Sequence, residues 1–252
     1  MSRSSLAMLV VGVVLLTGCT HRSARTEVPP PPTIETANPS AAATAPASPN
    51  KPAKPSYPSE EEVTIGGEGR ALYVETGIAS WYGPPYHNRR AANGEVYDMN
   101  ALTAAHRTLP LGTVVRVTNP KTRHSVVVKI TDRGPFIEGR LLDLSLAAAR
   151  KVDVWGPGTA VVRIEVLQTP APIDRGGRWA IQIGGFGQQR TASQLCESIS
   201  RRYHTAKVQE FNSPTGAWWV RVRVPDDDKH RAEELAHDTH TPEGGIFLVR
   251  LD

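Results

Sequence analysis

Residues 79–145 read ASWYGPPYHNRRAANGEVYDMNALTAAHRTLPLGTVVRVTNPKTRHSVVVKITDRGPFIEGRLLDLS. This stretch places polar side chains that can do chemistry between short runs of β-branched residues. The side chains that stand out are Glu95, His106, Asp132 and Arg133. The residues before this stretch have the composition of a targeting signal and a tether, and those after Pro170 have the pattern of a second, smaller domain.

Strand signals recur at short spacing through and beyond this stretch. Runs rich in Val and Ile, alternating with period two, lie at 113–118, 125–131 and 160–167. A short helix is expected at 146–151, with Asp143 or Ser145 as its N-cap. Short strands with Gly and Pro between them predict a small β-barrel over residues 72–168.

Asp132 is the residue best placed for acid chemistry. It ends a predicted strand and enters a tight Arg-Gly-Pro turn, which presents its carboxyl group at a barrel rim beside Arg133. Cleavage of a glycosidic bond needs a carboxyl group that protonates the leaving oxygen. Glu95 or His106 could tune the pKa of Asp132 or bind the sugar. A turn-capping role for Asp132 and a structural role for His106 stay open at this stage.

A zinc site built from Glu95, His106 and Asp132 is the weaker interpretation. Neither an HExxH motif nor paired-Cys spacing supports it. We therefore expect neither a metal nor a cofactor.

Several motifs occur here in an order that resembles the rare lipoprotein A family. They are ASWYG (79–83), ANGE (92–95), LTAAH (102–106), LPLGT (109–113), DRGPF (132–136) and DLS (143–145). The resemblance implies a double-psi β-barrel, an architecture shared with expansins and a class of lytic transglycosylases.

The resemblance also implies an activity and a site. The activity is lytic transglycosylation of peptidoglycan glycan strands that lack peptides, at the septum where daughter cells separate. In that reaction the C6 hydroxyl of N-acetylmuramic acid attacks its own C1, so one carboxyl group can act as acid and then as base. The implied functional residues are Glu95, His106 and Asp132, with Trp81, Tyr82 and Arg133 as candidates for substrate binding. The alternatives are a non-catalytic, expansin-like glycan-binding protein and a hydrolase that leaves a reducing end.

Residues 178–252 form the second predicted domain, after a linker at 169–177. Strands are expected at 179–186, 207–212, 218–224 and 245–251, and helices at 191–203 and 226–238. This β-α-β-β-α-β order is shared with RNA-recognition domains, but the aromatic-rich RNP1 signature is missing, so nucleic acid is not the expected partner.

Two segments of this domain, 179–186 and 218–225, resemble a SPOR domain. The resemblance implies binding to peptide-free glycan strands through an open sheet face. The positions that match that face are Gln182, Trp219, Arg221 and Val249.

The N-terminus has the pattern of a bacterial lipoprotein signal over residues 1–18. An apolar run at 6–16, too short to span a bilayer, leads to Leu-Thr-Gly-Cys, which resembles a lipobox ending at Cys19. An acylated Cys19 would anchor the protein in a membrane, and Thr20 favours the periplasmic face of the outer membrane over the inner membrane.

The segment 19–71 is expected to be a disordered tether. Residues 28–58 hold 10 of the 21 prolines, a composition that does not support a packed core. Such a tether reaches on the order of 100 Å. Beyond Cys19, the chain has one further cysteine, Cys196, which fits a buried core thiol with no disulfide. The net charge of +4 suits an anionic polymer, and a monomer is expected.

Overall fold

The computed structural model describes residues 71–241 and 243–252, all within one compact unit, Pro52–Asp252. The predicted signal peptide, Cys19 and all but the last residue of the predicted tether lie outside the described residues. In the described part of the chain, no helix is both long and apolar enough to cross a membrane.

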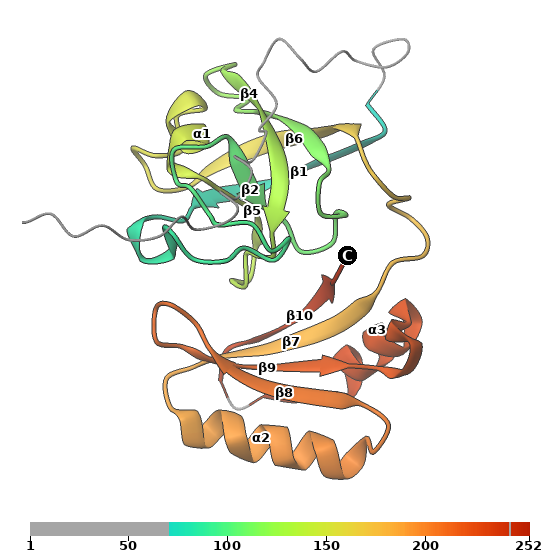
Figure 1. Cartoon of the computed structure of the whole chain (residues 1–252). Helices are drawn as coiled ribbons and strands as arrows, with labels where there is room; N and C mark the ends of the chain where they lie inside the picture. Colours follow the sequence, from blue (N-terminus) through green and yellow to red (C-terminus); the bar gives the residue numbers. More distant parts are fainter. Residues whose placement is uncertain (1–70, 242) are drawn as a thin grey trace, which may run out of the picture. The chain divides into compact units, whose positions relative to one another are not determined.

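The first domain is a closed barrel with the strand order β1-β5-β2-β4-β3-β6 (Figure 1). The strands are β1 (Tyr73–Trp81), β2 (Thr103–Ala105), β3 (Val114–Thr118), β4 (Ser125–Asp132), β5 (Arg140–Leu144) and β6 (Ala160–Gln168). Strands β1 and β5 pair in parallel, as do β2 and β4, and the other pairs are antiparallel. The mixed pairing agrees with the predicted double-psi β-barrel.

The barrel interior is filled by the inward-facing residues of the strands. Val115, Val117, Val128 and Ile164 are fully buried there, and each such side chain stabilises the fold by about 1.5–3 kcal/mol. A 3₁₀ turn, η1 (Pro84–Tyr86), follows β1, and helix α1 (Leu146–Lys151) follows β5. Of the two expected caps for this helix, the structure uses Ser145, whose Oγ accepts the Ala148 N–H at 3.2 Å.

The second domain is an antiparallel sheet with the order β10-β7-β9-β8. Its strands are β7 (Trp179–Phe186), β8 (Lys207–Asn212), β9 (Trp218–Arg223) and β10 (Gly245–Arg250); its helices are α2 (Gln189–Arg202), α3 (Lys229–Asp238) and the 3₁₀ turn η2 (Pro225–Asp227). Helices α2 and α3 cover one face of the sheet (Figure 1), where Ile199 and Leu235 pack on Ile181 and Val220. This arrangement confirms the predicted β-α-β-β-α-β domain.

Candidate functional site

The site begins with a row of side chains across four neighbouring strands of the barrel. Strand pairing places Ser80 of β1 opposite Asp143 of β5. It also places Ala105 of β2 opposite Asp143 on one side and opposite Asp132 of β4 on the other. Residues that pair directly across strands point to the same face of a sheet. The row therefore presents two carboxyl groups, with the small methyl group of Ala105 between them.

A β-bulge aims Asp132 into this row. The alternation of burial along β4 breaks at Ile130 and Thr131, which are both buried. The register against β2 shifts at this point, so that Ala104 pairs with Ile130 and Ala105 pairs with Asp132. A bulge of this kind turns the following side chain to the other face of the sheet, and here it brings the carboxyl group to the side of Ala105.

Backbone groups hold the Asp132 carboxyl group in place. Its Oδ1 accepts the N–H of Ala92 at 2.9 Å and that of Arg133 at 2.8 Å. Burial raises the pKa of Asp132 against the opposing effect of these two N–H groups, and the negative charge of Asp143 raises the pKa further. A carboxyl group that keeps its proton to a higher pH than usual suits a general acid.

Asp143 is the second carboxyl group of the site. Ser80 Oγ donates a hydrogen bond to Asp143 Oδ1, and Arg140 Nη1 donates to Ser80 Oγ at 3.0 Å. Gly134 leaves space above this carboxyl group: a Cβ at that position would lie 3.7 Å from Asp143 Oδ2 and 3.7 Å from Ala105 Cβ. Its φ of 147° also favours glycine.

Both carboxyl groups line one pocket of about 460 Å³. The sequence-predicted site residues that line it are Tyr82, Asp132, Arg133, Gln182, Trp219 and Arg221. Glu95, His106, Trp81 and Val249 are not among its lining residues. Asp143 and Ala105 line it and were not predicted, although both belong to the quoted motifs LTAAH and DLS.

His106 points away from the carboxyl row because it follows Ala105 along the chain. Its Nδ1 accepts the backbone N–H of Thr108 at 3.2 Å and of Leu109 at 3.0 Å. Its Nε2 lies 3.8 Å from Glu75 Oε2. Burial lowers the pKa of His106, so the imidazole is neutral at pH 7. In this geometry His106 shapes the loop after β2 and does not reach the pocket.

Glu95 belongs to the turn that supports Asp132. Its Oε2 accepts a hydrogen bond from Asn93 Nδ2 at 2.8 Å, and its N–H donates to Asn93 Oδ1 at 3.0 Å. The same turn is held against β4 by the Asn93 N–H, which donates to Thr131 O at 3.1 Å. Glu95 is thus placed to position the Ala92 N–H that binds Asp132.

Arg133 is buried, and its guanidinium group binds backbone carbonyls. Nη1 donates to His106 O at 3.0 Å and to Leu109 O at 2.8 Å, while Nη2 donates to Asp252 O at 2.6 Å. Nε donates to Arg250 O. These four bonds leave one N–H of the guanidinium group for a ligand.

The predicted aromatic residues differ in their surroundings. Tyr82 stacks on Tyr97 with ring centroids 4.3 Å apart and lines the pocket. Trp81 packs against the barrel core instead. Trp219 lies in a cluster with Phe247 and Val249, and its ring centroid is 5.4 Å from that of Phe136.

The remaining sheet residues are tied to one another. Arg221 Nη2 donates to Gln182 Oε1 at 2.7 Å. Gln182 and Val249 are only 2% and 0% exposed, so this sheet face is largely packed. The part of the face that borders the pocket includes residues of the central strands β7 and β9.

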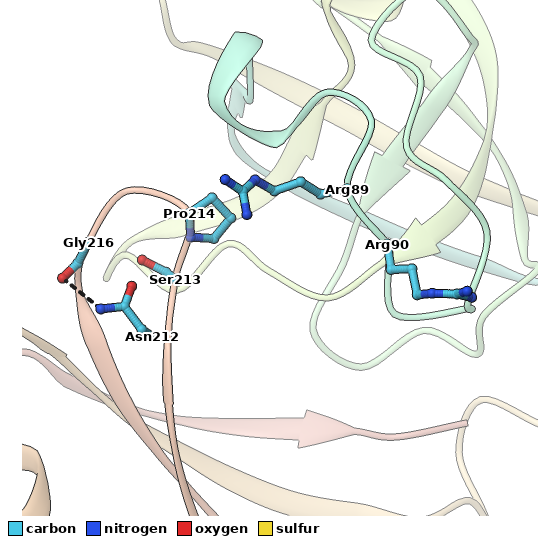
Figure 2. A pocket seen from close by; sticks show the side chains of 6 residues that line it. All are labelled: Arg89, Arg90, Asn212, Ser213, Pro214 and Gly216. Atoms are coloured by element: carbon cyan, nitrogen blue, oxygen red, sulfur yellow. Dashed lines mark hydrogen bonds between the residues drawn. The ribbon is translucent and has the colours of Figure 1, made fainter.

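A second hollow adjoins this pocket and is shown in Figure 2. Its lining consists of Arg89 and Arg90 from the loop after η1 and of Asn212, Ser213, Pro214 and Gly216 from the β8–β9 turn. Arg89 Nε donates to Pro85 O at 3.0 Å and Arg90 Nη1 donates to Gly94 O at 3.0 Å. Neither arginine has a carboxylate partner among the described residues.

Two protein families match the chain. The family described as "Lytic transglycolase" matches residues 74–164, and the SPOR domain family matches residues 176–238. An endolytic peptidoglycan transglycosylase RlpA of Campylobacter jejuni is 38% identical over 156 residues, which cover 52% of this chain and 55% of that protein. The RlpA of Neisseria meningitidis strain MC58 is 43% identical over 135 residues, which cover 53% of this chain and 56% of that protein.

A probable RlpA of Synechocystis is 56% identical over 95 residues, covering 38% of this chain and 30% of that protein. The chain thus spans about half the length or less of these curated relatives. Among solved structures, a Streptomyces papain inhibitor aligns with a TM-score of 0.32 at 20% identity, covering 39% of this chain and 97% of the inhibitor. A Clavibacter michiganensis expansin aligns with a TM-score of 0.33 at 18% identity, covering 60% and 80% of the two chains.

The fold and the matched families define a double-psi β-barrel domain of the lytic transglycosylase type, followed by a SPOR domain. The predicted resemblance is confirmed by these matches. Over about half of its length the chain is similar to rare lipoprotein A (RlpA) proteins.

Proposed function

We propose that this protein is an endolytic lytic transglycosylase of peptidoglycan glycan strands. The observation that carries the proposal is the Asp132 carboxyl group, which lines a pocket of sugar-accommodating size and whose pKa is raised by burial. The names of the relatives, as transglycosylases acting on peptidoglycan, supply the substrate class.

Asp132 performs both proton transfers in this proposal. Its proton goes to the leaving glycosidic oxygen as the bond to C1 of N-acetylmuramic acid breaks. The C6 hydroxyl oxygen of the same sugar then bonds to C1, and its proton returns to Asp132. The glycosidic bond to the leaving sugar is exchanged for an intramolecular C1–O6 acetal bond, no water is consumed, and the carboxyl group is regenerated.

Mass spectrometry of digested peptide-free glycan tests the proposal. A transglycosylase leaves 1,6-anhydro ends. Reducing ends would instead identify a hydrolase, and the absence of products from a verified substrate would identify an expansin-like binding protein.

We further propose that peptide-free strands are preferred because of their charge. Removal of the stem peptide leaves a free lactyl carboxylate on each N-acetylmuramic acid. The hollow in Figure 2 offers two cations beside the catalytic pocket, Arg89 and Arg90, which have no carboxylate partner among the described residues. Cations without a carboxylate partner are suited to an anionic strand.

The double substitution Arg89→Gln and Arg90→Gln is therefore expected to raise KM for peptide-free glycan by roughly 2- to 10-fold, because exposed charge pairs contribute modestly. The salt dependence of KM should weaken as well. Steady-state kinetics at two salt concentrations measure both. The matched control is Arg201→Gln with Arg202→Gln at the end of α2. Equal effects of the two double variants would contradict the assignment.

The SPOR domain supports septal recruitment as part of the same proposal. Gln182, Trp219 and Arg221 border the pocket that contains the two carboxyl groups. We propose that one glycan strand contacts this part of the sheet face and the barrel site together, so that recruitment and cleavage act on the same strand. Trp219 would contribute by stacking on a sugar face.

The lipobox-like motif supports a lipid anchor at Cys19, on the periplasmic face of the outer membrane. Cys19→Ala is expected to release the protein from membrane fractions, because the acyl chains supply the binding energy. Immunoblotting of separated membrane and soluble fractions measures this. Continued sedimentation of the variant with outer membrane would refute the anchor.

A further inference from the structure

We propose that Asp143 is a second catalytic carboxyl group, which acts as the carboxylate facing the reacting sugar while Asp132 carries the proton. The inference deepens the proposed function and rests on it. Asp143 and Asp132 both pair with Ala105, from opposite sides, and both line the pocket. Because adjacent strands lie about 4.8 Å apart, the two Cα atoms are about 9–10 Å apart, with only the methyl group of Ala105 between them.

Two polar side chains orient Asp143 and favour its ionised form against burial, which raises its pKa. The Ser80 hydroxyl group accepts a hydrogen bond from Arg140 and so directs its own proton to Asp143 Oδ1. This leaves Asp143 Oδ2 facing the space beside Gly134. Ser80 and Arg140 are positioning residues in this arrangement.

The surrounding charges favour Asp143 as the carboxylate of the pair. Burial raises the pKa of Asp143, but Ser80, Arg140 and Arg107 all oppose this rise. Burial also raises the pKa of Asp132; the N–H groups of Arg133 and Ala92 and the charge of Arg133 oppose this rise, and the charge of Asp143 adds to it. Arg221, Tyr82 and Tyr97 also lie within electrostatic range. Both tyrosines have pKa values raised by burial and stay neutral at pH 7. We assign the proton of the pair to Asp132, because the Ser80 hydroxyl group donates its hydrogen bond to Asp143.

A carboxylate at this position has a defined role in the reaction. Positive charge develops at C1 and the ring oxygen as the glycosidic bond breaks, and a nearby fixed negative charge stabilises it. Asp143 neither gains nor loses a proton during the cycle. Its charge also keeps Asp132 protonated, because two neighbouring carboxyl groups do not ionise together readily.

The variant Asp143→Asn tests the inference, because the amide keeps the shape of the carboxyl group and removes its charge. We expect kcat/KM on peptide-free glycan to fall by roughly tenfold or more. The alkaline limb of the pH–rate profile, which reports ionisation of the general acid, should move to lower pH. A merely structural role would reduce the rate without moving this limb. Glu138→Gln, an exposed carboxyl group on the barrel, is the control.

A second measurement does not depend on activity. Carbon-detected NMR titration of the full chain should show the pKa of Asp132 falling in Asp143→Asn and staying unchanged in Glu138→Gln. If the wild type is active and Asp143→Asn leaves the rate and the pH profile unchanged, the role of Asp143 is overturned and the proposed function stands. A wild type that yields no anhydro ends would overturn the proposed function, and an unchanged Asp132 pKa in that case would overturn the carboxyl pair as well.

Discussion

Asp132→Asn is expected to abolish 1,6-anhydro product formation while the protein stays folded. The variant loses the proton donor, and removal of a general acid or base typically costs about 10²–10⁴-fold in rate. The side-chain oxygen of asparagine can still accept the N–H groups of Ala92 and Arg133, so the turn at 91–95 keeps its anchor. Mass spectrometry of the digest and a kcat measurement give the result.

The stability of the same variant separates chemistry from folding. The pKa of Asp132 is raised in the folded state above its ordinary value of 3.8, so folding favours the protonated form. The stabilisation from this group is present at low pH and is lost as the pH rises through the window above 3.8. Asp132→Asn should therefore unfold at an equal or higher temperature than the wild type at pH 7.

Asp153→Asn is the control for this comparison, since it changes a half-exposed carboxylate that bonds to His124 outside the pocket. It should keep wild-type activity. A well-folded Asp132→Asn variant that retains most of its activity, while Glu95→Gln loses it, would move the acid from Asp132 to Glu95.

Much of the fold follows from the sequence because the hydrophobic pattern is clear in those parts. Strands β3, β4 and β6 have β-branched alternation, and each was predicted to within one or two residues. The second domain was predicted in full, since each of its strands and helices contains enough periodic residues to be recognised.

The three barrel strands that were not predicted from the sequence carry Ser80, Ala105 and Asp143 of the carboxyl row. Strand β2 has three residues, β5 is RLLDL without a β-branched residue, and β1 contains Gly77 and polar residues at its start. None of them gives a periodic signal of useful length. Their parallel pairing with β4 and with each other joins distant segments, which no local pattern encodes.

This explains why Asp132 was predicted and Asp143 was not. Asp132 ends a recognisable strand, whereas Asp143 lies in an unrecognised one and resembled a helix cap. Whether His106 and Glu95 reach the pocket also depends on strand positions and loop contacts that the sequence does not reveal. Strand alternation after β2 turns His106 away from the pocket, and Glu95 is engaged by Asn93 inside its own turn.

The spacing of the two carboxyl groups makes Ala105 the most size-sensitive position of the site. Ala105→Val places two methyl groups between Asp132 and Asp143, in the part of the pocket where the proposed reaction places the sugar. A displacement of the substrate by about 1 Å can cost about 10²-fold in rate, so kcat/KM should fall by about that factor or more. Steady-state kinetics on peptide-free glycan provide the measurement.

The neighbouring alanine supplies a matched control. Ala104 is fully buried and faces the barrel core, on the opposite side of β2 from Ala105. Ala104→Val adds the same two methyl groups and should destabilise the barrel by about 1–3 kcal/mol through overpacking, without narrowing the pocket. The folded fraction of Ala104→Val should keep its activity. Ala105→Ser adds a single small atom to the side chain and should keep its activity as well. If Ala104→Val and Ala105→Val lower activity only in proportion to their loss of stability, the cleavage site does not lie between the two carboxyl groups.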